Sequence, residues 1–161
     1  MRRKDREVKD INRILKIIDK AKILHFGMFT DEYPYIVPLH YGYEYEDGCF
    51  IFYMHSAKEG YKLDLIRNNP KVCIELEYGV EVISGDQIQC KYGAAYSSVI
   101  GRGKAEIIDN EQEKIKGLKL LMLNQTHKEF NINEKMAASV IVLKVTIEDF
   151  TAKERSAPSD K

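Results

Sequence analysis

The sequence has no net charge, few cysteines and no long apolar run, and each absence excludes a class of protein. Lysine plus arginine and aspartate plus glutamate each number 25, so the chain lacks the basic excess of a broad nucleic-acid-binding surface. No apolar run approaches the length of a membrane span, and the basic start 1–4 lacks the apolar stretch of a signal peptide. We therefore expect neither nucleic acid nor membrane as a partner.

The three cysteines, Cys49, Cys73 and Cys90, are odd in number and form no C-x-x-C pair. This pattern favours reduced thiols in a cytoplasmic protein over a disulfide framework. Several short signatures of catalytic or nucleotide-binding sites are also missing: G-x-G-x-x-G, the Walker lysine loop, H-E-x-x-H and G-x-S-x-G. The segment 101–103 (GRG) has too few glycines and lies inside a predicted strand, so it does not indicate nucleotide binding.

What the chain contains is a series of short apolar strands with amphipathic helices between them. Its 161 residues suit one domain, which we expect over residues 1–150, followed by a polar tail over 151–161. Apolar spacing predicts three main helices and six strands. The helices are expected at 7–20, 58–67 and 110–123, and the strands at 23–29, 35–45, 49–55, 71–78, 96–108 and 138–147. Many short antiparallel strands flanked by helices predict an α+β barrel.

Two turns in this pattern affect where side chains are placed. Asp47-Gly48 predicts a hairpin. A two-residue loop there places His40 opposite His55, whereas a three-residue loop places them on opposite faces, and the sequence leaves both registers open. Pro38 cannot donate a ladder hydrogen bond, so it indicates an edge strand or a bulge. Residues 79–93 predict only a hairpin or a surface excursion.

The segment 55–62, HSAKEGYK, lies where a predicted strand ends and a predicted helix begins, and it supports two interpretations. Ser56 and Glu59 match a capping box, in which each side chain satisfies a free N–H group of the first helical turn. The same helix start could instead bind an anion, with Ser56 adding a hydroxyl and Lys62 an ammonium group. Glu59 counts against the second interpretation unless its carboxylate turns away.

Two longer segments carry a resemblance to a known family. PYIVPLHYGYEYEDGCFIFYMHSAKEGYKLDLIRNNPKVCIELE (34–77), followed by YSSVIGRGKAEII (96–108), resembles the pyridoxamine 5'-phosphate oxidase-like, FMN-binding split-barrel family. Within it, the sequence is most similar to the 5-nitroimidazole-resistance and flavin-nucleotide-binding branch. The resemblance implies a split β-barrel of roughly six antiparallel strands, closed or nearly closed, in a homodimer with two flavin sites at the subunit interface.

The resemblance also implies which residues hold the flavin. The phosphate is expected near His55, Ser56 and Lys62, and the isoalloxazine ring along the strand of Val37, Pro38 and Leu39. The partner subunit is expected to contribute Tyr96, Ser97 and Ser98.

Histidine titrates near neutral pH, so it is the natural proton donor. His55 is the predicted catalytic histidine and His40 the alternative, whereas His25 and His127 receive structural interpretations. Three strand histidines could converge on a metal, but no ligand-spacing motif is present, so no metal is expected.

The implied function is FMN-dependent reduction of small electrophiles such as nitroimidazoles or other nitroaromatics, by hydride transfer from reduced flavin. The alternative is a flavin-binding module, for storage or sensing, without a dedicated substrate. FAD stays possible as the cofactor because residues 79–93 could cover an adenylate. The sequence offers no counterpart for the basic residues that would hold a substrate phosphate, so we do not expect oxidation of pyridoxamine phosphate.

Overall fold

The computed structural model describes residues 2–157, which form an α+β fold dominated by antiparallel strands, as predicted. The strands are β1 (Glu7–Val8), β2 (Leu24–Met28), β3 (Tyr35–Leu39), β4 (Gly42–Glu46), β5 (Cys49–Ser56), β6 (Lys71–Ile83), β7 (Gly93–Ile108) and β8 (Ile141–Arg155). The helices are α1 (Ile11–Lys20), α2 (Tyr61–Asn68), α3 (Glu111–Thr126) and α4 (Glu134–Ala138), with 3₁₀ turns at Lys4–Arg6 and Gln89–Lys91.

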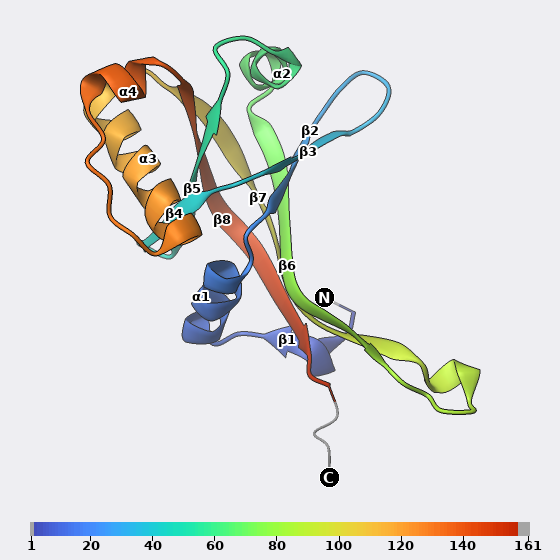
Figure 1. The fold of residues 1–161 in the computed structure, drawn as a ribbon. Helices are drawn as coiled ribbons and strands as arrows, with labels where there is room; N and C mark the ends of the chain where they lie inside the picture. The colour runs from blue at the N-terminus through green and yellow to red at the C-terminus, as the bar shows by residue number, and fades with distance from the viewer. Residues whose placement is uncertain (1, 158–161) are drawn as a thin grey trace.

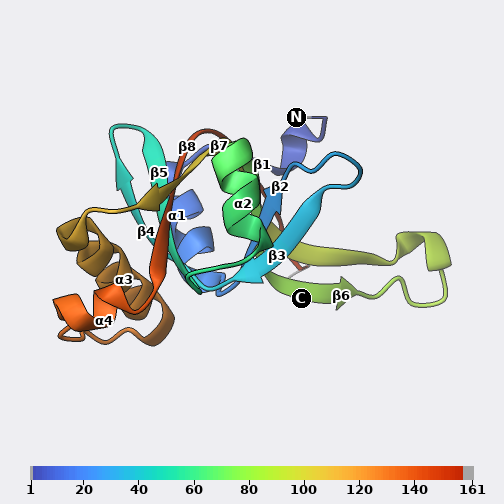
Figure 2. The same ribbon diagram turned by 90° about the horizontal axis from the view of Figure 1, so that it is seen from above.

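All strands belong to one antiparallel sheet with the order β3-β2-β6-β7-β8-β5-β4, and β1 pairs with the far end of β8. The sheet curls around a core of aromatic and aliphatic side chains, with α2 lying over one end, α3 packed against β4 and β5, and α4 packed against α3 (Figures 1 and 2). The split-barrel prediction is confirmed. Within the described residues, however, no strand pairing joins β3 to β4, so the barrel is not closed by hydrogen bonds.

The single strand predicted over 35–45 is wrong, because the chain divides into β3 and β4, at opposite ends of the sheet. The division falls at Tyr41, which is fully buried. Its hydroxyl donates to the carbonyl oxygens of Ile18 (2.6 Å) and Ala21 (2.8 Å), at the end of α1. These two hydrogen bonds hold the buried Tyr41 hydroxyl against the end of α1, and the backbone leaves the sheet at this residue. Strand periodicity does not reveal this break.

The hairpin between β4 and β5 has a two-residue loop, the first of the two alternatives that the sequence left open. Glu46 pairs with Cys49, and Asp47 and Gly48 both adopt positive φ angles, 50° and 85°. The ladder nevertheless ends at Gly42, which pairs with Tyr53. His40 therefore lies outside the β4–β5 ladder and is not a cross-strand neighbour of His55.

The long strands β6 and β7 behave largely as their sequences predict. Val72, Ile74 and Leu76 are buried on one face of β6, and the intervening residues lie on the other face. The pairing of β7 with β8 shifts register between Arg102 and Gly103, where a Cβ atom on Gly103 would lie 1.9 Å from the Thr146 carbonyl oxygen. The strand therefore has a β-bulge here, with very close backbone packing at Gly103.

Residues 79–93, for which the sequence predicted a hairpin or excursion, form an extension of the β6–β7 hairpin that projects away from the barrel (Figure 1). A bulge follows Tyr78, and Gly79 adopts a φ of 65°. Val80 and Val82 are exposed on this arm.

Two helix starts differ from the sequence prediction. Residues 7 and 8 form the short strand β1, and α1 begins at Ile11, after the Asp10 side chain accepts from the Asn12 N–H. Helix α3 begins at Glu111, one residue later than predicted, and is capped by Asn110. The cap of α4 is Asn133. Asp109 and Asn110 are both good caps, so sequence preference alone does not separate them.

The domain boundary expected at residue 150 is wrong for residues 151–155, which continue β8 and pair with β7 and β1. Ala152 is buried there, and Arg13 of α1 pairs with Glu154 through two 2.6 Å contacts. The last part of the predicted tail, 158–161, lies outside the described residues. No helix among the described residues is long and apolar enough to span a membrane.

Candidate flavin site

The predicted cofactor residues occupy three places: strand β3, the corner between β5 and α2, and the first part of β7. The first two lie at the same end of the barrel, where α2 crosses near β2 and β3 (Figures 1 and 2). An edge-to-face contact between Tyr35 of β3 and Tyr61 of α2, with ring centroids 5.1 Å apart, joins them directly. The structure thus brings together two of the three predicted segments.

Strand β3 is an edge strand, which accounts for Pro38. Pro38 is exposed on the outer face of the sheet, whereas Val37 and Leu39 are half-buried against the core. A ligand lying on the outer face would therefore meet the Pro38 side chain and the β3 backbone, but not the side chains of Val37 and Leu39.

At the β5–α2 corner, the side chains of His55 and Ser56 project to opposite faces of β5, as adjacent strand residues must. Ser56 is only 4% exposed, on the inner face that also carries Phe52 and Met54. His55 is exposed on the face covered by α3 and borders an apolar cavity of about 330 Å³. The cavity is otherwise lined mainly by Leu118, Leu121, Met122, Phe130, Ile132 and Met136. The two side chains therefore do not converge on one phosphate group.

The capping-box interpretation of this corner is wrong. Ser56 is the last residue of β5, and α2 begins only at Tyr61, three residues later than predicted. The N-cap is Gly60, whose φ of 146° favours glycine, and no side chain caps the helix. A Cβ atom added to Gly60 would meet nothing within 4 Å.

This uncapped start is the feature that fits a phosphate group. The N–H groups of Tyr61 and Lys62 belong to the first helical turn and have no carbonyl partner in the helix. The Leu63 N–H bonds to the Gly60 carbonyl oxygen at 2.9 Å. Lys62 is half-buried in that same turn. Free N–H donors, the positive end of a helix dipole, an ammonium group and open space together suit an anion.

The third segment lies away from the other two. On β7 the side chains alternate, so Tyr96 and Ser98 face outward whereas Ser97 is 6% exposed and faces the core. Pro38 and Ser98 share the outer face but lie three strands apart, roughly 14 Å at the usual spacing. A ring resting on Pro38 is thus out of reach of Ser98 in the same chain.

The remaining histidines differ in their surroundings. His40 Nδ1 lies 2.9 Å from Gln125 Oε1 and 3.2 Å from the Lys22 carbonyl oxygen, so it joins three segments. His127 is the left-handed C-cap of α3. His25 Nδ1 lies 3.0 Å from Glu75 Oε2, on the outer face of the sheet.

Sequence reasoning treated His25 as structural, and it missed this pair. The pairing of β2 with β6 joins residues fifty positions apart, and no local signal predicts it. Within residues 2–157, no group of three or more histidine, cysteine, aspartate or glutamate residues is placed to bind a metal ion.

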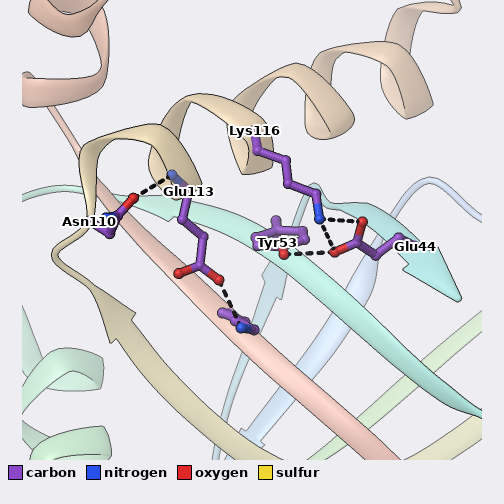
Figure 3. Close-up of polar contacts among 6 residues, drawn as sticks. Glu44, Tyr53, Asn110, Glu113 and Lys116 are labelled. Atoms are coloured by element: carbon purple, nitrogen blue, oxygen red, sulfur yellow. Dashed lines mark hydrogen bonds and ion pairs between the residues drawn. The ribbon is translucent and has the colours of Figure 1, made fainter. Parts of the chain in front are cut away.

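The buried tyrosines act as structural hydrogen-bond donors. Tyr53 donates to Glu44 at 2.8 Å, and Lys116 of α3 pairs with the same carboxylate at 2.7 Å (Figure 3). Burial, and secondly the bond to Glu44, raises the pKa of Tyr53. Burial likewise raises the pKa of Tyr41. Both phenols therefore stay protonated over the physiological pH range.

Comparison with known proteins identifies the family. The family model described as pyridoxamine 5'-phosphate oxidase matches residues 10–154. The chain belongs to this family. A comparison with curated protein sequences gives no significant match.

Solved structures give the same fold. A candidate 5-nitroimidazole antibiotic resistance protein from Bacteroides thetaiotaomicron superposes with a TM-score of 0.76 and 31% identity, over 91% of this chain and 85% of that one. The FAD- and heme-binding protein from Mycobacterium smegmatis gives 0.77 and 15%, over 97% and 77%. The flavocytochrome Anf3 from Azotobacter vinelandii gives 0.76 and 19%, over 100% and 75%. At these lower identities the last two support the fold alone.

Proposed function

We propose that this protein binds a flavin, FMN in the first place and FAD as the alternative, and uses it to reduce small electrophiles such as nitroimidazoles or other nitroaromatics. The single observation that carries the proposal is the uncapped start of α2, where Gly60 leaves open space beside free N–H groups and Lys62. Membership in the pyridoxamine 5'-phosphate oxidase family supports the cofactor, and the 31% identity to the Bacteroides protein supports the substrate class.

In this proposal the chain's residues have separate tasks. Lys62 and the first-turn N–H groups of α2 hold the phosphate, with Ser56 close by on the inner side of the corner. Pro38 and the β3 backbone support the ring, which supplies hydride chemistry when bound. His55 remains the predicted catalytic histidine. Its apolar cavity has no lysine, arginine or carboxylate in its lining and suits an uncharged aromatic group.

We further propose a homodimer in which the partner subunit completes the site with Tyr96 and Ser98. Ser97 is expected to contribute through its backbone only, because its side chain faces the core. Two observations support the proposal. Pro38 and Ser98 of one chain are too far apart to share a ring, and the outer face that carries them exposes apolar side chains, Ile36 at 59% and Ile100 at 44%.

The test begins with the visible spectrum and mass of the protein as purified. A yellow protein that releases FMN on heating, and that oxidises NAD(P)H faster with a nitroimidazole than free FMN does, supports the proposal. Tight flavin binding with no acceptor reduced above the free-flavin rate would instead indicate a storage or sensing module. Absence of flavin binding at micromolar concentration contradicts both. Sedimentation equilibrium measures whether the protein is a dimer, and Ile100→Glu is the variant expected to dissociate it.

A further inference from the structure

His25 lies on the outer face of β2, directly between Pro38 of β3 and Glu75 of β6. The strand registers pair His25 with Pro38 on one side and with Glu75 on the other. Directly paired residues project from the same face of a sheet. The neighbours of His25 along β2, Leu24 and Phe26, are fully buried, which confirms that His25 faces away from the core. Its imidazole therefore adjoins the surface on which the proposed flavin ring rests.

The Glu75 carboxylate orients this imidazole. Its Oε2 lies 3.0 Å from His25 Nδ1. A carboxylate can only accept a hydrogen bond, so Nδ1 is the donor in this contact and Nε2 is the ring nitrogen left for a ligand. Within residues 2–157, no hydrogen bond to Nε2 is formed, and the His25 side chain is 44% exposed. The imidazole thus presents Nε2 to a ligand, while the Glu75 carboxylate fixes the orientation of the ring through Nδ1.

The other histidines lack this combination. His55 borders an apolar cavity whose lining contains no carboxylate. His40 uses Nδ1 for contacts with Gln125 and the Lys22 backbone, and His127 caps α3. Only His25, among the four, both contacts a carboxylate and shares the outer face with Pro38.

We propose that His25, oriented by Glu75, donates a proton to an electrophile that is reduced at the flavin bound on the Pro38 face. This inference rests on the proposed function. For a nitro acceptor, a bound reduced flavin would supply one hydride and His25 Nε2 one proton, which together would convert the nitro group to a nitroso group and water. One N–O bond breaks, the oxygen leaves as water, and His25 becomes neutral and is reprotonated by solvent.

The first test needs no turnover. Imidazole ¹H–¹⁵N spectra of the full chain are recorded as FMN is added, and signals are assigned with single His→Gln variants of the other three histidines. We expect FMN to shift the His25 signals, to leave the His127 signals unchanged, and to find Nδ1 protonated in the neutral ring. FMN binding that leaves His25 unperturbed overturns this inference but not the proposed function. Failure of FMN to bind overturns both.

The second test is kinetic. We expect His25→Gln to lower kcat for a nitroimidazole about 100-fold, with KM and FMN affinity changed less than about twofold. Glu75→Gln should lower kcat less, and His127→Gln is the matched control with wild-type kinetics. A solvent deuterium effect on kcat should accompany the proton donation and change in His25→Gln. Wild-type kcat in a folded His25→Gln protein overturns the inference, and the same measurement on His55→Gln tests the prediction for that residue.

Discussion

The N-termini of α2 and α3 are built in opposite ways. At α3 the Asn110 side chain accepts from the Glu113 N–H at 3.0 Å, and the Glu113 carboxylate in turn binds Lys144 at 2.7 Å (Figure 3). One turn further on, Lys116 pairs with Glu44. At α2 the N-cap is Gly60, which contributes no side chain and leaves open space around it.

This difference separates a helix start that serves stability from one that is available to a ligand. A side-chain cap contributes about 1 kcal/mol, and α2 forgoes it although Ser56 and Glu59 stand close by in the sequence. The first-turn N–H groups of α3, which packs on β4 and β5, therefore have a side-chain partner in Asn110. The first-turn N–H groups of α2, near β3, have no side-chain cap. Four substitutions test this contrast.

The largest effect is expected where α3 meets the sheet. A Cβ atom at Gly42 would lie 2.1 Å from the Leu121 nitrogen and 2.2 Å from the Leu120 carbonyl carbon, so Gly42→Ala forces β4 and α3 apart. We expect a loss of about 3 kcal/mol in the free energy of unfolding, measured by urea denaturation. Gly48→Ala is the control: it meets no atom within 4 Å, and only its positive φ opposes it, for about 1 kcal/mol. Equal losses would show that the α3 packing is looser than described.

The next effect concerns the ligand-facing helix. Lys62→Ala removes the ammonium group from the first turn of α2 and should weaken FMN binding about tenfold or more, because charge-assisted hydrogen bonds contribute roughly 1.5–3 kcal/mol. The free energy of unfolding without flavin should stay within about 0.5 kcal/mol of wild type. Lys58→Ala, at an exposed lysine before the helix, is the matched control for net charge. Flavin fluorescence titration measures both, and equal affinities would remove Lys62 from the phosphate site.

At the capped helix α3, a smaller effect is expected, on stability and not on flavin affinity. Asn110→Ala removes the acceptor for the Glu113 N–H and should lower the free energy of unfolding by about 1 kcal/mol. Flavin affinity should not change, since α3 does not carry the phosphate donors. A large loss of flavin affinity in this variant would mean that the two helix starts are not independent.

The smallest effect depends on pH. The hydrogen bond from Arg13, reinforced by its charge, lowers the pKa of Glu154 below its ordinary value of 4.5. A lowered pKa in the folded state gives stability that is present above the ordinary value and is lost as pH falls through the folded-state pKa. Glu154→Gln should therefore cost about 0.5–1 kcal/mol at pH 7, discounted for solvent screening. The difference should vanish in strong acid, and a deficit that persists there would mean lost packing instead of lost charge.

Sequence patterns predicted the elements whose signals are local. Apolar spacing over 71–78 predicted the first part of β6, and Asp47-Gly48 predicted the tight hairpin. The start of α2 was mispredicted because Ser56 and Glu59 match a capping box in letters, whereas the backbone stays extended until Gly60. The boundary at residue 150 failed because β8 pairs with β1, a strand from the other end of the chain.

The candidate site shows the same division. The resemblance named Pro38, Lys62 and Ser98, and the structure places an exposed Pro38 and a half-buried Ser98 on one face of the sheet. The resemblance does not show that Ser97 faces the core, or that His55 and Ser56 project to opposite faces of β5. Side chains alternate along a strand with a fixed period, but which of them face the core depends on how the strands pair. The pairing of His25 with Glu75 had no local signal at all.

Local patterns in the sequence specify the family, the antiparallel α+β class and the positions of most strands, because periodicity and turn residues act over a few neighbours. Contacts between distant segments set which side chains share a face, where β3 and β4 separate, and that α2 begins without a cap. Those features follow from the register of strands distant in sequence and from the burial of Tyr41, and no local pattern encodes either one.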